Sequence, residues 1–263
     1  MVDLELALSV AKQASLEAGE LLLSGFERLS DAAVQSKGVS RDLVTDLDLA
    51  SERLIVGLIK SSFPEHEIEA EEEFRDRSPG PGYRWIIDPL DGTVNFVHGL
   101  PVFGVSIALY EGLRPLVGVI HLPRLEESYW AVEGGGAYGP GGAIRVRETE
   151  RLSDAVLATG FPYRRNELEH DNLANLGRFF YDVRGVRRMG SAAADLAFVA
   201  AGRLDGFWEL HLGSHDVAAG ALIVREAGGM VTDADGGEDW LRGGHIVAAG
   251  PQLHPQIQSR IAH

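Results

Sequence analysis

The chain has 263 residues, of which 45% are hydrophobic, and a formal net charge of −15 at pH 7. This length predicts one large globular domain or two tightly joined halves. The acidic charge argues against a nucleic-acid-binding surface, because a phosphate backbone requires a basic face. The chain has no cysteine, which excludes thiolate catalysis, zinc–thiolate sites and disulfides and suits a reducing cytoplasm.

Two features argue against a targeting or membrane segment. Asp3 and Glu5 stand where a signal peptide would carry positive charge. The longest charge-free stretch, residues 92–110, is interrupted by Pro101 and contains three glycines, so it does not have the character of a membrane span. We therefore expect a cytoplasmic protein without a membrane partner.

Hydrophobic periodicity predicts helices and strands that alternate loosely along the chain. In chain order these are a helix over 3–26, a helix over 45–62, strands over 83–87, 102–110, 116–122, 128–132 and 155–159, a helix over 166–181, a helix over 191–201, a strand over 204–210 and a helix over 216–227. A glycine cluster at 134–142 predicts a division into an N-terminal half, 1–145, and a C-terminal half, 146–263. The predicted architecture is a layered α/β fold.

The strongest chemical signal follows the apolar strand that contains Trp85, in the sequence DPLDGT at 88–93. Pro89 forces a turn, so Asp88 and Asp91 can converge on one cation. The carbonyl of Leu90 can add a neutral oxygen ligand. Oxygen ligands of this kind suit Mg²⁺.

The same turn can also bind an anion. The backbone N–H groups of Gly92 and Thr93 come where a helix begins, a position that favours a phosphate group. Taken alone, however, the segment is also typical of a strand followed by an Asp N-cap.

Three further acidic segments have ordinary structural interpretations when each is taken singly. The run at 69–73, which contains Glu71, is typical of a solvated surface. Thr45 and Asp48 resemble a capping box with Asp in place of Glu. Asp216 stands at the head of an apolar helix, where the helix dipole favours an acid.

Together these segments resemble the inositol monophosphatase family over nearly the whole chain. The segments that carry the resemblance are 42–48 (DLVTDLD), 71–72 (EE), 85–93 (WIIDPLDGT), 95–99 (NFVHG), 190–193 (GSAA), 216–220 (DVAAG) and 226–229 (EAGG). The resemblance implies an αβαβα sandwich, shared with sugar bisphosphatases such as fructose-1,6-bisphosphatase.

The resemblance also implies a role for each site residue. The metal ligands would be Glu71, Asp88, the Leu90 carbonyl, Asp91 and Asp216, with a third, weaker ion near Glu71. The catalytic residues would be Glu71, Thr93 and Asp48, of which the last two orient the attacking water. The substrate would contact Asp91, Gly92, Thr93, Gly190, Ser191, Ala192 and Glu209, with Glu209 binding a hydroxyl group.

The implied cofactors are two or three Mg²⁺ ions, with Mn²⁺ as a substitute and Li⁺ and Ca²⁺ as inhibitors. So many carboxylates can converge while ionised only if cations neutralise them. Such ions would activate water as the nucleophile and stabilise the leaving oxygen of an in-line displacement. The resemblance further implies a small phosphorylated polyol or sugar as substrate, and a homodimer.

The leading interpretation is hydrolysis of inositol 1-phosphate. Fructose-1,6-bisphosphatase or a dual activity stands next, followed by histidinol phosphatase and a 3′-nucleotidase. The Asn95-Phe96 pair and Glu209 argue against the 3′-nucleotidase. A different class is a non-catalytic, transcription-associated interaction protein. A decayed enzyme would be expected to have lost a ligand, and none is missing here.

Two positions depart from the family pattern, and neither removes a ligand. His215 stands where the family usually has Trp, and Ala70 stands where Gly is usual. The first departure bears on pocket shape and substrate identity. The nine histidines show no metal-binding spacing. Residues 134–139 match G-x-G-x-x-G, but no helix pattern follows, so a glycine hairpin turn is the better interpretation.

Overall fold

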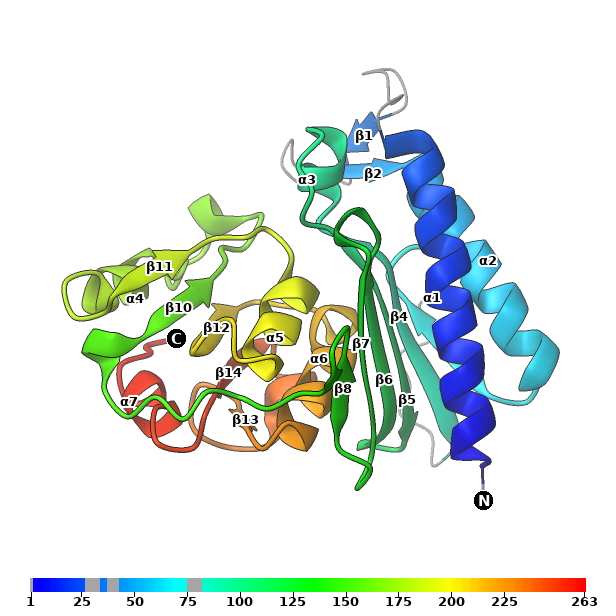
Figure 1. Ribbon diagram of the computed structural model, residues 1–263. Coiled ribbons are helices and arrows are strands. Elements are labelled where there is room, and N and C mark those ends of the chain that lie inside the picture. Colours follow the sequence, from blue (N-terminus) through cyan, green and yellow to red (C-terminus); the bar gives the residue numbers. More distant parts are fainter. Residues whose placement is uncertain (1, 27–33, 37–42, 75–81) are drawn as a thin grey trace.

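A computed structural model describes residues 2–26, 34–36, 43–74 and 82–263 of the chain. The helices and sheets form five layers in the order helix, sheet, helix, sheet, helix (Figure 1). This arrangement confirms the predicted αβαβα sandwich. Asp42, the first residue of the acidic segment 42–48, lies outside the described residues.

The first outer layer consists of two helices that cover one face of the larger sheet (Figure 1). These are α1 (Leu4–Phe26) and α2 (Asp46–Ser62). Between them in sequence, β1 (Val34–Ser36) pairs antiparallel with β2 (Leu43–Thr45). Thr45 caps α2 and forms the predicted capping box with Asp48, which confirms that interpretation of the segment.

The larger sheet has seven strands, in the order in which they occur in the sequence. They are β3 (Glu67–Ala70), β4 (Tyr83–Asp91), β5 (Gly104–Glu111), β6 (Arg114–Leu122), β7 (Glu127–Val132), β8 (Ala137–Gly139) and β9 (Gly142–Ala143). β3 runs parallel to β4, and the other neighbours are antiparallel. The glycine cluster therefore lies in hairpins, as predicted, and β3 is a strand that the sequence analysis did not predict.

Both faces of this sheet are buried, because successive side chains of a strand point to opposite faces and helices cover each face. In β4, Trp85 and Ile87 pack with the outer helices, whereas Ile86 packs with the middle layer. The middle layer consists of α5 (Ala192–Ala200) and α6 (Ser214–Glu226) from the C-terminal half. The two halves thus share one hydrophobic core, and their division at residue 145 stays a prediction.

The smaller sheet has five strands in the order β11, β10, β12, β14, β13. Their bounds are β10 (Val156–Thr159), β11 (Gly185–Arg187), β12 (Gly206–Leu210), β13 (Met230–Thr232) and β14 (His245–Ala249). The last layer contains α4 (Leu173–Phe179) and α7 (His254–Gln258), which cover the outer face of this sheet. In β12, Phe207 points to the middle layer and Trp208 to the outer one.

The helix predicted over 166–181 is wrong in extent, because α4 begins only at Leu173. Asn172 has a left-handed backbone, with φ at 75°, and is buried. Its side chain donates to the Gly160 carbonyl at 2.7 Å and accepts from Trp208 Nε1 at 2.8 Å. These tertiary hydrogen bonds override the local helical periodicity.

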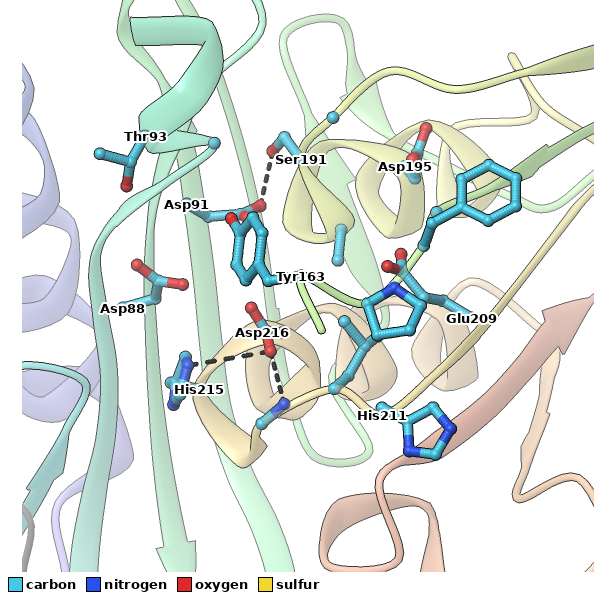
Figure 2. Close-up of a pocket in the computed structure, with 18 of the residues that line it drawn as sticks. Asp88, Asp91, Thr93, Tyr163, Ser191, Asp195, Glu209, His211, His215 and Asp216 are labelled. Carbon is cyan, nitrogen blue, oxygen red and sulfur yellow. Dashed lines mark hydrogen bonds and ion pairs between the residues drawn. The ribbon is translucent and has the colours of Figure 1, made fainter. Parts of the chain in front are cut away.

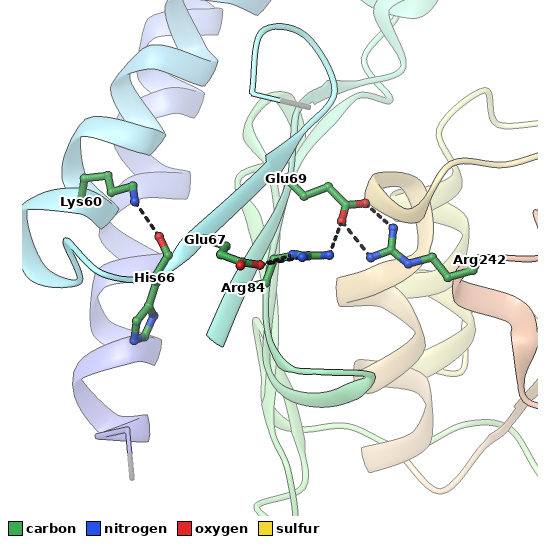
Figure 3. A network of polar contacts seen from close by, with 6 residues as sticks. All are labelled: Lys60, His66, Glu67, Glu69, Arg84 and Arg242. Atoms are coloured by element: carbon green, nitrogen blue, oxygen red, sulfur yellow. Dashed lines mark hydrogen bonds and ion pairs between the residues drawn. The ribbon is translucent and has the colours of Figure 1, made fainter. Parts of the chain in front are cut away.

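A network of ion pairs joins the first sheet to the C-terminal half (Figure 3). Glu69 of β3 lies between Arg84 of β4 and Arg242, whose two terminal nitrogens lie 2.7 and 2.8 Å from the Glu69 carboxylate oxygens. Burial would raise the pKa of Glu69, but hydrogen bonds from Arg242 and Ser214 outweigh it and hold the pKa below its usual value. The network therefore fixes the start of α6, where Ser214 lies, against the edge of the first sheet.

None of the helices in the described residues combines the length and the apolar character that a membrane span requires.

Candidate metal centre

The carboxyl end of β4 carries the predicted carboxylates. The register between β4 and β5 shifts between Asp88 and Asp91, because Pro89 interrupts the ladder there. Leu90 N donates a hydrogen bond to Asp88 Oδ1 at 3.0 Å. Asp88 is only 2% exposed. The bulge thus turns two nearby acids toward one pocket.

Asp91 joins the two halves of the chain. Its Oδ2 accepts hydrogen bonds from Ser191 Oγ at 2.5 Å and from Ala193 N at 2.7 Å, at the start of α5. Ser191 is also the N-cap of α5, as predicted, and accepts from Ala194 N. The carboxylate is therefore held by residues that lie about a hundred positions further along the chain.

Asp216 enters the same pocket from the first turn of α6. Its Oδ2 accepts a hydrogen bond from Gly213 N at 2.6 Å, so it also stabilises the helix start. Figure 2 shows Asp88, Asp91 and Asp216 facing one another across the pocket, from β4 and α6. One oxygen from each of the three carboxylates lies within 4.8 Å of the other two, a spacing that one metal ion can bridge.

A second candidate group of ligands lies beside the first. One ligand atom each from Glu71, Asp88 and His215 also lies within 4.8 Å of the others. Glu71 follows β3 directly, and Asp88 is shared by both groups. His215 belongs to this group although its spacing in the sequence predicts no metal site.

The electrostatics of the site show that cations would stabilise it. Burial raises the pKa of Asp88 well above its usual value, and the charges of Glu71, Asp91 and Asp216 raise it further. Burial, together with the charge of Asp216, raises the pKa of Asp91 to about 7. Carboxylates that repel one another in a buried pocket fit divalent cations, which neutralise them. The acidic groups could therefore hold metal ions.

Thr93 and Asp48 form the predicted pair. Thr93 is the first residue of α3 (Thr93–Val97), and Asp48 is fully buried in α2. The Thr93 hydroxyl lies 3.2 Å from Asp48 Oδ1 and 3.1 Å from the Leu90 carbonyl oxygen, so it can donate to one of them at a time. Gly92, with φ at 93°, makes the turn before α3. Asp48 therefore serves both the cap of α2 and the contact with Thr93.

The carboxylates line a cavity of about 270 Å³ between the two halves. Gly190, Ser191 and Ala192 form one wall, and Glu209 of β12 lies deeper in the C-terminal half. Glu209 is 9% exposed. Burial and then the charge of Asp216 raise its pKa to about 8, although Arg188 opposes this shift. The cavity thus presents acidic ligands at one side and a buried carboxyl at the other.

The structure brings together nearly all of the predicted site residues. Those that line the cavity are Glu71, Asp88, Leu90, Asp91, Gly92, Thr93, Gly190, Ser191, Ala192, Glu209 and Asp216. Asp48 does not line the cavity and reaches it through Thr93. The individual roles of these residues stay predictions.

Asp195 and Tyr163 are among the lining residues that the sequence analysis missed. Asp195 of α5 is 1% exposed, and its Oδ1 has no hydrogen-bond partner in the described structure. Burial, and then the charges of Glu209 and Asp91, raise its pKa well above the usual value. An acid inside the otherwise apolar run 192–200 was the available signal. Tyr163, from the loop after β10, stands over the carboxylates (Figure 2) and had no such signal.

Comparisons with known proteins agree with this geometry. A family model described as the inositol monophosphatase family matches residues 3–263. A protein of Pasteurella multocida named Nus factor SuhB is 43% identical over 254 residues, which cover 97% of this chain and 95% of that protein. An inositol-1-monophosphatase of Mesorhizobium japonicum is 42% identical over 241 residues, which cover 92% of this chain and 90% of that protein.

A solved structure is similar over the same length. The inositol monophosphatase of Anabaena (Nostoc) superposes with a TM-score of 0.88 at 37% identity, covering 98% of this chain and 96% of that one. The match of the family model, the identity to relatives and the shared fold all extend over nearly the whole chain. The chain therefore belongs to the inositol monophosphatase family.

Proposed function

We propose that this protein is a Mg²⁺-dependent phosphate monoester hydrolase whose substrate is inositol 1-phosphate. The observation that carries this proposal is the convergence of Asp88, Asp91 and Asp216 on one point of the cavity, next to Thr93 and Asp48. Fructose 1,6-bisphosphate stands as the alternative substrate, because the same centre suits any small phosphate ester.

The cations, the Thr93–Asp48 pair and Glu209 have separate roles in the proposed reaction. When bound, the cations supply Lewis acidity toward the phosphoryl group and lower the pKa of water. Thr93 Oγ1 donates to Asp48, so its lone pairs accept a hydrogen bond from the attacking water and orient it for an in-line approach. Glu209 accepts a hydrogen bond from a substrate hydroxyl at the far side of the cavity.

The test is phosphate release by the purified protein with Mg²⁺, on inositol 1-phosphate and fructose 1,6-bisphosphate in parallel. We expect hydrolysis that EDTA abolishes and Mg²⁺ restores, with a higher kcat/KM for the inositol ester. A preference for the bisphosphate would leave the proposed Mg²⁺-dependent hydrolysis standing and would change the proposed substrate to fructose 1,6-bisphosphate. Absence of phosphate release from either ester, in protein that binds Mg²⁺, would contradict the proposal. We further expect inhibition by Li⁺ and Ca²⁺ in the same assay, and a homodimer on sedimentation.

Replacing Glu209 with glutamine should raise the KM for inositol 1-phosphate by about tenfold, while hydrolysis of an aryl phosphate without hydroxyl groups changes little. The assay is run above pH 8, where Glu209 is ionised, and an amide accepts a weaker hydrogen bond from a hydroxyl than a carboxylate does. The comparison is of kcat/KM on both substrates for the wild type and Glu209→Gln. Equal losses on both would refute a role in hydroxyl recognition.

A transcription-associated role is a second candidate. The observation that favours it is the 43% identity to a protein named Nus factor SuhB, which matches the 42% identity to an inositol-1-monophosphatase. Binding of the purified chain to transcription complexes assembled in vitro would test it. Binding that Asp91→Asn leaves intact would show a function separate from hydrolysis, and absence of binding would remove the candidate.

A further inference from the structure

The side chain of His215 borders the metal centre. It is the second residue of α6 and is 23% exposed. Figure 2 shows it below Asp88 and beside Asp216, on the wall of the cavity. A ring nitrogen of His215 lies within 4.8 Å of a ligand oxygen of Glu71 and of Asp88. Among the described residues, all the other side chains in the two candidate ligand groups are carboxylates.

Two contacts fix the backbone that carries His215. Ser106 Oγ of β5 donates to the His215 carbonyl at 3.4 Å. The neighbouring Ser214 hydroxyl donates to Glu69, which Arg242 holds through two further hydrogen bonds. Ser106 and Glu69 both belong to the first sheet, the sheet that carries Asp88. The position of His215 relative to that carboxylate is therefore determined by the fold.

The chain also leaves room for the imidazole ring. A Cβ atom at Gly213 would lie 2.4 Å from His215 Cε1 and 2.8 Å from Nε2, so a larger residue at 213 would displace the ring. His215 Nε2 lies 3.8 Å from Asp216 Oδ2, which is too long for a hydrogen bond. This distance does not commit the nitrogen to a hydrogen bond with Asp216.

The oxygen ligands beside His215 need a cation independently of the histidine. Asp88 is 2% exposed, lines the cavity, and is surrounded by the charges of Glu71, Asp91 and Asp216. A cation at this point would lie within reach of the imidazole. Mg²⁺ strongly prefers oxygen ligands and retains its waters, whereas imidazole nitrogen suits first-row transition metals, above all Zn²⁺, Cu²⁺, Fe²⁺ and Ni²⁺. Mn²⁺ favours carboxylates as Mg²⁺ does but is the softer of the two ions, so a nitrogen ligand favours Mn²⁺ over Mg²⁺.

We propose that His215 is a nitrogen ligand of the cation held by Glu71 and Asp88, and that it makes this position select a first-row transition metal such as Mn²⁺ over Mg²⁺. This inference rests on the proposed function, because it concerns the same metal centre. It assigns a metal-selecting role to one of the two residues that depart from the pattern of the family.

The test is the electron spin echo envelope modulation of the full-length protein loaded with one equivalent of Mn²⁺. We expect modulation from a directly coordinated ¹⁴N nucleus in the wild type, and its replacement when histidine is labelled with ¹⁵N. In His215→Gln, which keeps a polar side chain but removes the imidazole, the nitrogen signal should disappear. His215→Ala provides a second variant should the first bind metal through its amide.

Binding constants give a second readout. The Kd for Mn²⁺, measured by calorimetry, should rise by about tenfold or more in both His215 variants, whereas the Kd for Mg²⁺ changes much less. The matched control is His211→Asn, which replaces another histidine of the cavity wall outside the candidate ligand groups. His211 has a left-handed backbone, with φ at 64°, which asparagine tolerates. The control should keep both the nitrogen signal and the affinity for Mn²⁺.

The outcomes separate this inference from the proposed function. Mn²⁺ binding without nitrogen coupling in the wild type, or coupling that persists in both His215 variants, would overturn the inference and leave the phosphatase proposal standing. A wild-type protein that binds neither Mn²⁺ nor Mg²⁺ would overturn both.

Discussion

Replacing Asp91 with asparagine is expected to lower the kcat/KM for Mg²⁺-dependent phosphate release by about a thousandfold or more. The Asp91 carboxylate belongs to the ligand group that it forms with Asp88 and Asp216, and a neutral amide neither attracts nor orients divalent cations as a carboxylate does. The fold should persist, because an amide oxygen can still accept the hydrogen bonds from Ser191 Oγ and Ala193 N. Phosphate release by the purified variant measures the loss of activity, and its circular dichroism spectrum measures whether the fold persists.

The matched control for this substitution is Asp235→Asn, which neutralises an acid on the surface. The Asp235 side chain is 82% exposed and contacts His263 at 3.2 Å, outside the residues that line the cavity. We expect wild-type kinetics from it. A folded Asp91→Asn variant that keeps its activity would contradict the assignment of Asp91 to the metal centre.

The local parts of the site were predictable because short-range rules dictate them. The short apolar run that contains Trp85, followed by Asp88 and Pro89, predicts a buried strand that ends in a turn. The capping box of Thr45 and Asp48 needs only a spacing of three residues. The contact between Asp48 and Thr93 is of a different kind, because it joins positions 45 residues apart and follows only from the resemblance to the family.

The predictions that were wrong or missing concern features that depend on tertiary contacts, which short-range sequence rules do not describe. The predicted helix 166–181 is interrupted at Asn172, whose side chain bonds to Gly160 and Trp208 in the neighbouring sheet. His215 joins Glu71 and Asp88 only because α6 packs against the first sheet. Single residues whose partners lie on other elements give no periodic signal, so sequence patterns cannot find them.

The site lies between the two halves of the chain, and this position affects the free energy of folding. Asp88 and Asp91 come from the first sheet and Glu71 directly follows its strand β3, whereas Asp216 and Glu209 come from the second half of the chain. Folding the metal-free protein brings these like charges together and removes them from water, which costs free energy. Hydrogen bonds from Ser191 and Ala193 to Asp91 offset part of this cost. Stability should therefore depend on both pH and divalent cations.

In EDTA, the free energy of unfolding should fall by about 2 kcal/mol between pH 6.5 and pH 8.5. The folded-state pKa is about 7 for Asp91 and about 8 for Glu209, both raised by burial and by the charge of Asp216. Between the ordinary carboxyl pKa and these values the folded state binds more protons than the unfolded chain, so stability decreases as pH rises. Buried histidines such as His121 and His254, whose pKa is lowered by burial, act in the opposite direction, but only below about pH 6.5.

Urea unfolding at the two pH values, in EDTA and in Mg²⁺, measures this dependence. Mg²⁺ should stabilise the protein more at pH 8.5 than at pH 6.5, because it binds the ionised carboxylates and competes with protons for them. Glu209→Gln and Asp91→Asn should each reduce the fall seen in EDTA, since each variant removes one titrating group from the pocket. A fall of the same size in both variants would mean that neither Glu209 nor Asp91 causes it. A metal-free protein equally stable at both pH values would show that no carboxyl of the pocket titrates between them, which would contradict the raised pKa values of Asp91 and Glu209.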